Sequence, residues 1–130
     1  MDAKELVGLA DDELLGRREV LTAELAATGP FTPGSFQVEH VRCGKPNCRC
    51  AKEGDPGHGP FYSVARRESG RTVKRRVPVG MLDVVQGRVA AWRAFEDVCA
   101  ELADVNAEES RRLLLGTKPG GSARAPEKGD

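Results

Sequence analysis

Three cysteines and one histidine fall within sixteen residues near the middle of the chain, and this cluster limits how the chain can fold more than any other feature. Cys43, Cys48 and Cys50 lie in the run CGKPNCRC, and His58 follows in GHGPFY, which gives the spacing C-x4-C-x-C-x7-H. Three thiolates and one imidazole are an accepted tetrahedral ligand set for structural zinc. The spacing therefore predicts a zinc ion held by these four residues.

The residues alone leave alternatives open. His40 precedes the first cysteine by three residues and is the rival to His58 as the fourth ligand. The three thiols could instead be free and partly buried, or two of them could form a redox pair, although a Cys48–Cys50 disulfide would be strained over so short a span. The remaining cysteine, Cys99, lies on an apolar stripe and is interpreted as a small core residue.

Composition favours one small globular domain without a membrane anchor. The chain has 130 residues, of which 39% are hydrophobic and 5% aromatic, so its core should be thin and largely aliphatic. A metal ion would help to close a fold of this size. Since no apolar run approaches the roughly 18–20 residues of a membrane span, and the acidic N-terminal stretch lacks a signal-peptide core, we expect a cytoplasmic protein.

The hydrophobic periodicity changes along the chain from helix to strand and back to helix. It predicts a helix over residues 2–27, with either Asp2 or Asp11 as its N-cap and a break at Gly8 in the second case. A strand is predicted over residues 35–41, a hairpin with strands over 61–67 and 72–77, and a long helix from about residue 81.

The simplest assembly of these elements is an α+β fold. The N-terminal helix and the long C-terminal helix would pack together as an antiparallel pair, and a small antiparallel β-sheet would carry a zinc-knuckle-like loop. We predict that residues 1–116 form a single zinc-stabilised domain. The Gly-, Pro- and Lys-rich segment 117–130 is predicted to be disordered.

The charge of the chain is unevenly distributed. The 20 Lys and Arg residues balance the 20 Asp and Glu residues, but residues 35–80 alone hold ten basic and four acidic side chains. The segments before and after, 1–34 and 81–116, are net acidic. A basic middle segment favours a nucleic-acid partner, whereas pairing of the basic and acidic segments within the fold is the alternative.

Six cations fall within eleven residues of the predicted hairpin. A two-stranded ribbon fits the major groove of DNA, and arginine suits phosphate and guanine recognition. The alternative is charge that protects a sheet edge from pairing with other chains. Arg75 falls on the apolar side of its strand and should reach out to solvent or meet an acidic helix residue. The predicted nucleic-acid contacts are Arg66, Arg67, Arg71, Lys74 and Arg76.

The runs CGKPNCRC, GHGPFYSVARR and SGRTVKRRVP resemble the signature of a family of small, functionally uncharacterised bacterial and phage proteins. The shared pattern is a Gly-Ser lead-in, C-G-K-x-x-C-x-C, H-G-P-x-Y and a hairpin that ends in R-x-V-P. The resemblance covers about residues 12–110. It implies an association with mobile genetic elements and the same Cys/His set, carried here onto Cys43, Cys48, Cys50 and His58.

These observations together predict a small zinc-binding accessory or regulatory protein that binds nucleic acid, DNA more than RNA, through its basic hairpin. The alternative is a protein-interaction subunit or homodimer that uses its paired amphipathic helices, with zinc purely structural. No enzyme is expected, because the sequence has no Gly-rich phosphate loop and no Ser/His/Asp set. A hydrolytic site at the cluster would need Glu53 or Asp55 as its base.

Overall fold

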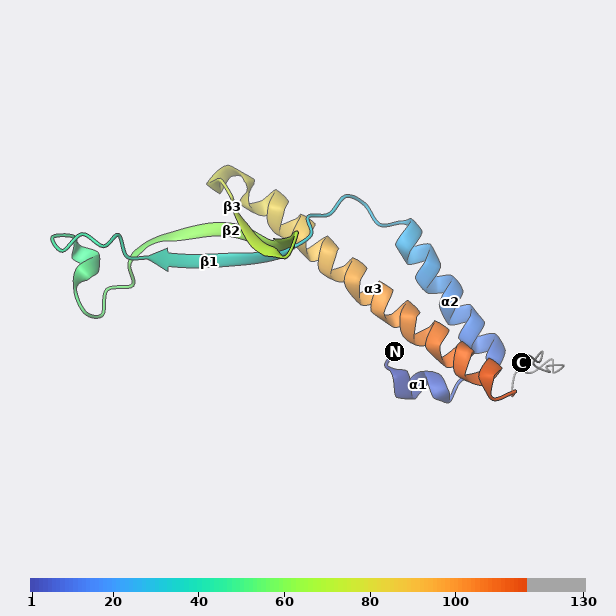
Figure 1. Ribbon diagram of the computed structural model, residues 1–130. Helices are drawn as coiled ribbons and strands as arrows, with labels where there is room; N and C mark the ends of the chain where they lie inside the picture. The colour runs from blue at the N-terminus through green and yellow to red at the C-terminus, as the bar shows by residue number, and fades with distance from the viewer. Residues whose placement is uncertain (117–130) are drawn as a thin grey trace. The chain divides into compact units, whose positions relative to one another are not determined.

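A computed structural model of the chain describes residues 1–116, and the segment predicted to be disordered, 117–130, lies outside the described residues. The elements follow one another in the order α1 (Ala3–Val7), α2 (Asp11–Ala26), β1 (Ser35–Val41), η1 (Arg49–Ala51), β2 (His58–Glu68), β3 (Arg71–Arg76), η2 (Val79–Met81) and α3 (Leu82–Leu114), where η marks a short 3-10 helix (Figure 1). None of the described helices combines the length and the apolar character that a bilayer crossing requires.

The chain divides into two compact units, and each is described by itself. The helical unit contains residues 1–29 and α3 from Ala94 onward, and the sheet unit contains Pro30–Arg93. The predicted α+β architecture, with its helix pair, antiparallel sheet and Cys/His loop, is confirmed. That residues 1–116 form one zinc-stabilised domain stays a prediction.

In the helical unit, α2 and α3 run antiparallel. Asp11 at the start of α2 contacts Arg112 near the end of α3, at 2.6 Å between Oδ1 and Nη1. Further along, Arg17 contacts Glu101, at 2.6 Å between Nη2 and Oε2. The helices enclose a small aliphatic core of leucine and valine, as the periodicity predicts, and Cys99 lies half-buried outside that core. Its fully buried members are Leu6, Leu14, Leu21 and Val105.

The N-terminal helix is interrupted, as the alternative with a break at Gly8 predicts. Asp2 and Glu5 form the expected capping box on α1, with reciprocal bonds of 2.8 and 2.9 Å between side chain and backbone N–H. The expected cap of the main helix at Asp11 is wrong. Ala10 is the N-cap, and its N–H donates to Glu13 Oε1 at 2.8 Å, so Asp11 falls inside the helix, where its carboxylate is used by Arg112.

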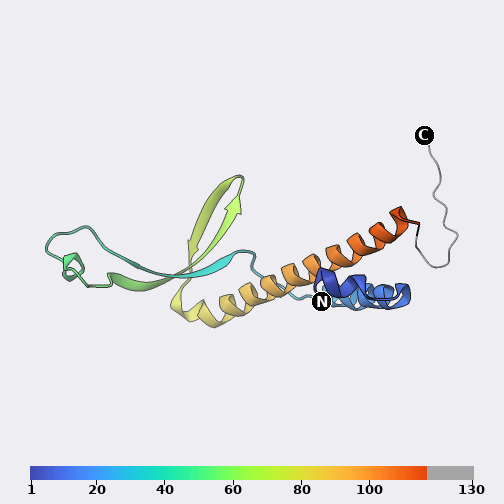
Figure 2. The same cartoon turned by 90° about the horizontal axis from the view of Figure 1, so that it is seen from below.

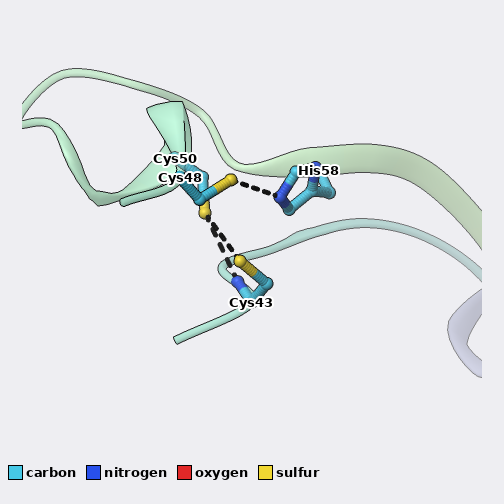
Figure 3. Close-up of side chains that lie close together, drawn as sticks. All are labelled: Cys43, Cys48, Cys50 and His58. Atoms are coloured by element: carbon cyan, nitrogen blue, oxygen red, sulfur yellow. Dashed lines mark hydrogen bonds between the residues drawn. The ribbon is translucent and has the colours of Figure 1, made fainter. Parts of the chain in front are cut away.

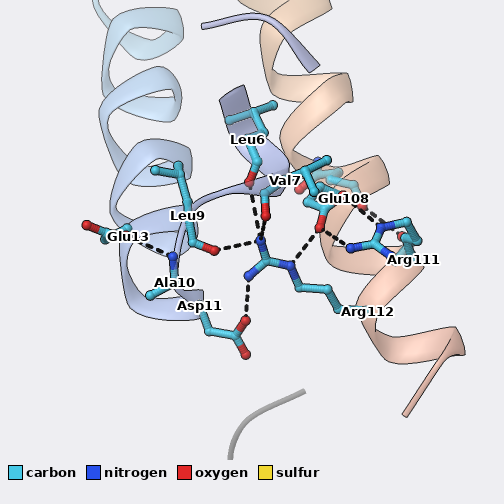
Figure 4. Close-up of polar contacts among 11 residues, drawn as sticks. Leu6, Val7, Leu9, Ala10, Asp11, Glu13, Glu108, Arg111 and Arg112 are labelled. Atoms are coloured by element: carbon cyan, nitrogen blue, oxygen red, sulfur yellow. Dashed lines mark hydrogen bonds and ion pairs between the residues drawn. The ribbon is translucent and has the colours of Figure 1, made fainter. Parts of the chain in front are cut away.

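Arg112 links the three helical elements of this unit through a buried guanidinium (Figure 4). It donates to Glu108 one turn back on α3, to Asp11 on α2, and to backbone carbonyls at the end of α1 and just after it. The last of these bonds, to the Leu9 carbonyl, is 2.7 Å long. Carbonyls at a helix end have no partner within the helix, so Arg112 satisfies groups that would otherwise need water.

In the sheet unit, the described strands form a three-stranded antiparallel sheet in the order β1-β2-β3. The first part of β2 pairs with β1 and its last part pairs with β3 (Figures 1 and 2). β2 begins at His58, three residues before the predicted Phe61, because its pairing with β1 continues to the mouth of the loop. β3 is shifted one residue toward the N-terminus of the predicted strand.

The pairing register sorts the side chains onto two faces, as expected. Phe36, Val64 and Arg75 lie opposite one another across the three strands and so share a face. Lys74 and Arg76 lie on the other face. Arg75 therefore does fall on the apolar side, but its partner is Glu68 from the same sheet, at 2.7 Å, and not an acidic helix residue.

Candidate metal centre

The ends of β1 and β2 bring the four predicted ligands together (Figure 3). Cys43 follows the end of β1, and His58 is the first residue of β2, where it pairs with Val41. Cys48 and Cys50 lie at the 3-10 turn η1, at the N-cap and inside the turn. The antiparallel pair thus closes the base of a loop whose turn points its thiols back toward that base.

The four side chains offer one donor atom each, and all four atoms lie within 4.8 Å of one another. Cys43 Sγ and Cys50 Sγ are 3.5 Å apart, and Cys48 Sγ lies 3.1 Å from His58 Nε2. His40, the rival ligand, is exposed and does not belong to this group. Three sulfurs and one ring nitrogen at such separations fit a single tetrahedral metal ion.

A β-bulge sets the position of His58. Between the pairs Glu39–Phe61 and Val41–His58, β2 contains one residue more than β1. Gly59 occupies this bulge at φ 132°, and a Cβ there would lie 2.8 Å from the carbonyl oxygen of Glu39. Because one extra residue reverses which face a side chain points to, the bulge aims His58 at the cluster. The strand predicted from the sequence begins after this point, at Phe61, and so does not include the bulge.

Arg42 holds the loop together without touching the sulfurs. Its guanidinium donates to the backbone carbonyls of Cys50, Lys52 and Asp55, the last at 2.6 Å. These carbonyls belong to a segment with little regular structure, where they have few backbone partners. This role of Arg42 was not predicted, because only its place directly before Cys43 distinguishes it in the sequence from the other arginines.

Asp55 completes the loop on its other side. Its Oδ1 accepts the N–H of Gly57 at 2.8 Å, and Arg49 Nη1 lies 3.1 Å from its Oδ2. The Gly57 N–H, helped by Arg49, holds the pKa of Asp55 below its ordinary value. Gly57 has φ 96°, and a Cβ there would lie 3.1 Å from the Val41 backbone. Only glycine fits this close approach without strain.

The thiols differ in acidity. The backbone N–H of Cys50, then the neighbouring thiols of Cys50 and Cys43, and also His58 lower the pKa of Cys48 to about 6. For the buried Cys50, the Cys43 N–H favours the thiolate, but burial and the neighbouring sulfurs outweigh it and raise its pKa. Metal binding needs thiolates, and among these thiols the surroundings of Cys48 favour the thiolate.

The cations of the hairpin differ in whether they already contact another group of the protein. Lys74 pairs with Glu39, Arg67 donates to the Gly70 carbonyl at 2.7 Å, and the Arg76 guanidinium lies 4.2 Å from the centre of the Phe61 ring. Within the described part of the chain, the guanidiniums of Arg66 and Arg71 form no ion pair or hydrogen bond. Of the predicted nucleic-acid contacts, these two side chains are therefore available to bind a partner.

Comparison with family descriptions gives a match to "Domain of unknown function (DUF6788)" over residues 11–86. The matched range contains the Cys/His cluster and the whole hairpin, and it agrees with the predicted resemblance to an uncharacterised family. Comparison with curated proteins and with solved structures gives no match.

Proposed function

We propose that this chain, which belongs to the family "Domain of unknown function (DUF6788)", binds a structural zinc ion and uses its basic hairpin to contact nucleic acid, DNA more than RNA. The convergence of four donor atoms within 4.8 Å carries the first part of the proposal. In a tetrahedral zinc site with Zn–S bonds of about 2.3 Å, neighbouring sulfurs lie about 3.8 Å apart. The 3.5 Å between Cys43 Sγ and Cys50 Sγ is close to that value.

The donor set favours a structural over a catalytic ion. Four protein ligands fill a tetrahedral shell and leave no position for a reactive water. Of the two carboxylates that could serve a hydrolytic mechanism, Glu53 and Asp55, the second is held by Gly57 and Arg49. We therefore propose that the ion supplies folding free energy and that the protein is not an enzyme.

Replacement of His58 tests whether His58 or His40 is the fourth zinc ligand. His58→Ala removes one of the four donors, so we expect the purified protein to contain much less than one equivalent of zinc, measured by elemental analysis. His40→Ala is the matched control, because His40 lies in the same sheet but outside the cluster, and it should retain one equivalent. The opposite pattern would assign the fourth position to His40.

The nucleic-acid part of the proposal is supported by the cations of the hairpin. Arg66 and Arg71 are exposed and have no ion-pair partner among the described residues. Lys74, Arg76 and Arg67 are exposed as well, and surface contacts such as the Lys74–Glu39 pair contribute only about 0–1 kcal/mol. Phosphates can therefore compete for these side chains.

A salt titration of binding tests this proposal. Fluorescence anisotropy with a short labelled duplex should show binding at low salt that weakens steeply as salt is added. The double variant with Arg66→Gln and Arg71→Gln has two cations fewer, so the fall of log affinity with log salt concentration should become less steep, its slope decreasing in magnitude by about 2. Arg75→Gln is the control, since Arg75 lies on the same hairpin but is already paired with Glu68. If neither duplex nor single strand binds at low salt, the nucleic-acid proposal is wrong.

The helical unit supports a second candidate function, protein interaction. Several apolar side chains of α2 and the end of α3 remain exposed, among them Leu15, Val20 and Leu113 at 47%, 47% and 48%. A protein partner or a second copy of the chain could cover them. The hairpin variant distinguishes the two functions, because it should lose nucleic-acid binding and keep any assembly that the helices make.

A further inference from the structure

The sheet unit contains a groove of about 460 Å³ that the proposed function does not use. This volume lies within the range of small-molecule sites, roughly 300–1,000 Å³. β2 and β3 form one wall, η2 and the first turn of α3 form another, and the connector before β1 closes the end. Its apolar lining consists of Pro33, Val64, Val77, Pro78, Met81 and Val85.

The walls of the groove are fixed by contacts within the sheet unit. The Thr32 N–H donates to the Arg88 carbonyl at 3.1 Å and ties the connector to α3. The rings of Phe31 and Trp92 reinforce this contact, with centroids 5.1 Å apart. Gly34 then lets the connector run against β2, since a Cβ there would lie 2.7 Å from the Ala65 carbonyl oxygen. The groove is therefore formed before any ligand arrives.

The charges around the groove favour an anion. Three arginines, Arg66, Arg75 and Arg76, and one acidic residue, Glu68, belong to its lining, but only Arg66 and Arg75 have side chains on the same face of the sheet as Val64. Arg75 is paired with Glu68, whereas the Arg76 guanidinium lies over the Phe61 ring on the other face of the sheet and adds no charge to the groove. Arg66 forms no hydrogen bond and no close ion pair within residues 1–116, although Arg75 and, to a smaller extent, the charge of Arg66 lower the pKa of Glu68. An apolar floor beneath an unpaired guanidinium suits a ligand with an apolar body and one anionic group.

We propose that this groove binds a small amphipathic organic acid. Its carboxylate would pair with Arg66, and its aliphatic body would lie against Val64, Met81 and Val85. Met81 is suited to this role because its unbranched thioether side chain adapts to irregular surfaces. The proposal depends neither on zinc nor on nucleic-acid binding, since it rests on the lining of the groove alone.

Titration of the full chain with sodium octanoate tests the proposal. We expect saturable binding by isothermal calorimetry, with amide shift changes in two-dimensional NMR confined to the residues of the groove. Octylammonium and 1-octanol have the same apolar body without the carboxylate, so both should bind at least about tenfold more weakly. Binding of octylammonium as tight as that of octanoate would overturn the proposal, and so would the absence of saturable octanoate binding.

Two pairs of variants assign the binding to this groove. Arg66→Gln should weaken octanoate binding at least about tenfold, whereas Arg71→Gln, which removes the other unpaired guanidinium of the hairpin, should not. Met81→Glu should abolish binding, whereas Val84→Glu, at a similarly exposed position outside the groove, should not. Equal losses within either pair would show that general charge, and not the groove, governs binding.

These variants also distinguish a failure of the groove proposal from a failure of the nucleic-acid proposal. Arg71→Gln should weaken nucleic-acid binding and leave octanoate binding unchanged. Octanoate binding without nucleic-acid binding would support the groove and reject the hairpin function, and the reverse result would reject only the groove.

Discussion

Cys48→Ser should leave the protein without bound metal and without a fixed structure in the loop between Arg42 and His58. The hydroxyl of serine is a poor zinc ligand, and three remaining donors would hold the ion far more weakly. The lost binding free energy is on the order of 10 kcal/mol, and in a site of this kind it is also folding free energy. Elemental analysis should fall from one equivalent of zinc to none, and the amide signals of the loop should collapse toward random-coil positions in NMR spectra.

Cys99→Ser is the matched control for this experiment. Cys99 is a free, half-buried thiol on α3, outside the group of four donors, so its replacement should retain one equivalent of zinc and the loop signals. Removing the metal from the unmodified protein with a chelator should reproduce the Cys48→Ser spectrum. A Cys48→Ser protein that still carries a full equivalent would show that the ion is not held by the Cys3His set.

Arg112→Ala should destabilise the helical unit by about 3–5 kcal/mol, the usual effect of removing one partner of a buried ion pair. The Arg112 side chain is only 10% exposed, and Glu108 beside it is 6% exposed. Without the guanidinium, the Glu108 carboxylate and the carbonyls of Leu6 and Leu9 would be left without this partner. Chemical denaturation followed by circular dichroism measures the loss.

Arg111→Ala provides a close comparison, because Arg111 precedes Arg112 and also pairs with Glu108, but its side chain is 50% exposed. Its removal should cost less than about 1 kcal/mol. Equal losses for the two variants would assign the effect to surface charge and not to the buried network.

Acid should weaken the same network in a defined pH range. Hydrogen bonds from Arg111 and Arg112 lower the pKa of Glu108 from its ordinary 4.5 to about 2. A carboxyl whose pKa is lowered by folding stabilises the folded state at pH values above the ordinary pKa, and this contribution is lost as the pH falls. The free energy of unfolding should therefore decline between about pH 4.5 and pH 2, and this decline should be shallower in Arg112→Ala.

The parts of the fold that could be predicted are those with a local signal. The spacing of Cys43, Cys48, Cys50 and His58 was enough to predict which side chains would gather, because short loops rich in glycine and proline bring nearby residues together. The alternation of residues 35–41 and the Glu68–Arg71 turn predicted a strand and a hairpin whose register follows from the turn.

The parts that could not be predicted depend on contacts between residues far apart in the sequence. Arg112 bonds to the carbonyl of Leu9, 103 residues earlier, and nothing in the pattern around either residue indicates that pairing. The prediction that Arg75 meets solvent or an acidic helix residue missed Glu68, because that pair depends on the register of β2 on β3. The bulge at Gly59 was missed because a single extra residue leaves no periodic trace.

The hydrogen bonds of Arg42 bear on how the loop would be prepared for the proposed ion. Each of its bonds to the carbonyls of Cys50, Lys52 and Asp55 can form in the metal-free chain, since none involves a sulfur or the imidazole. They bias the metal-free backbone toward its closed shape, so less conformational entropy would be lost on binding the proposed ion. In the proposed metal site, Arg42 would thus preorganise four donor atoms that it does not contact.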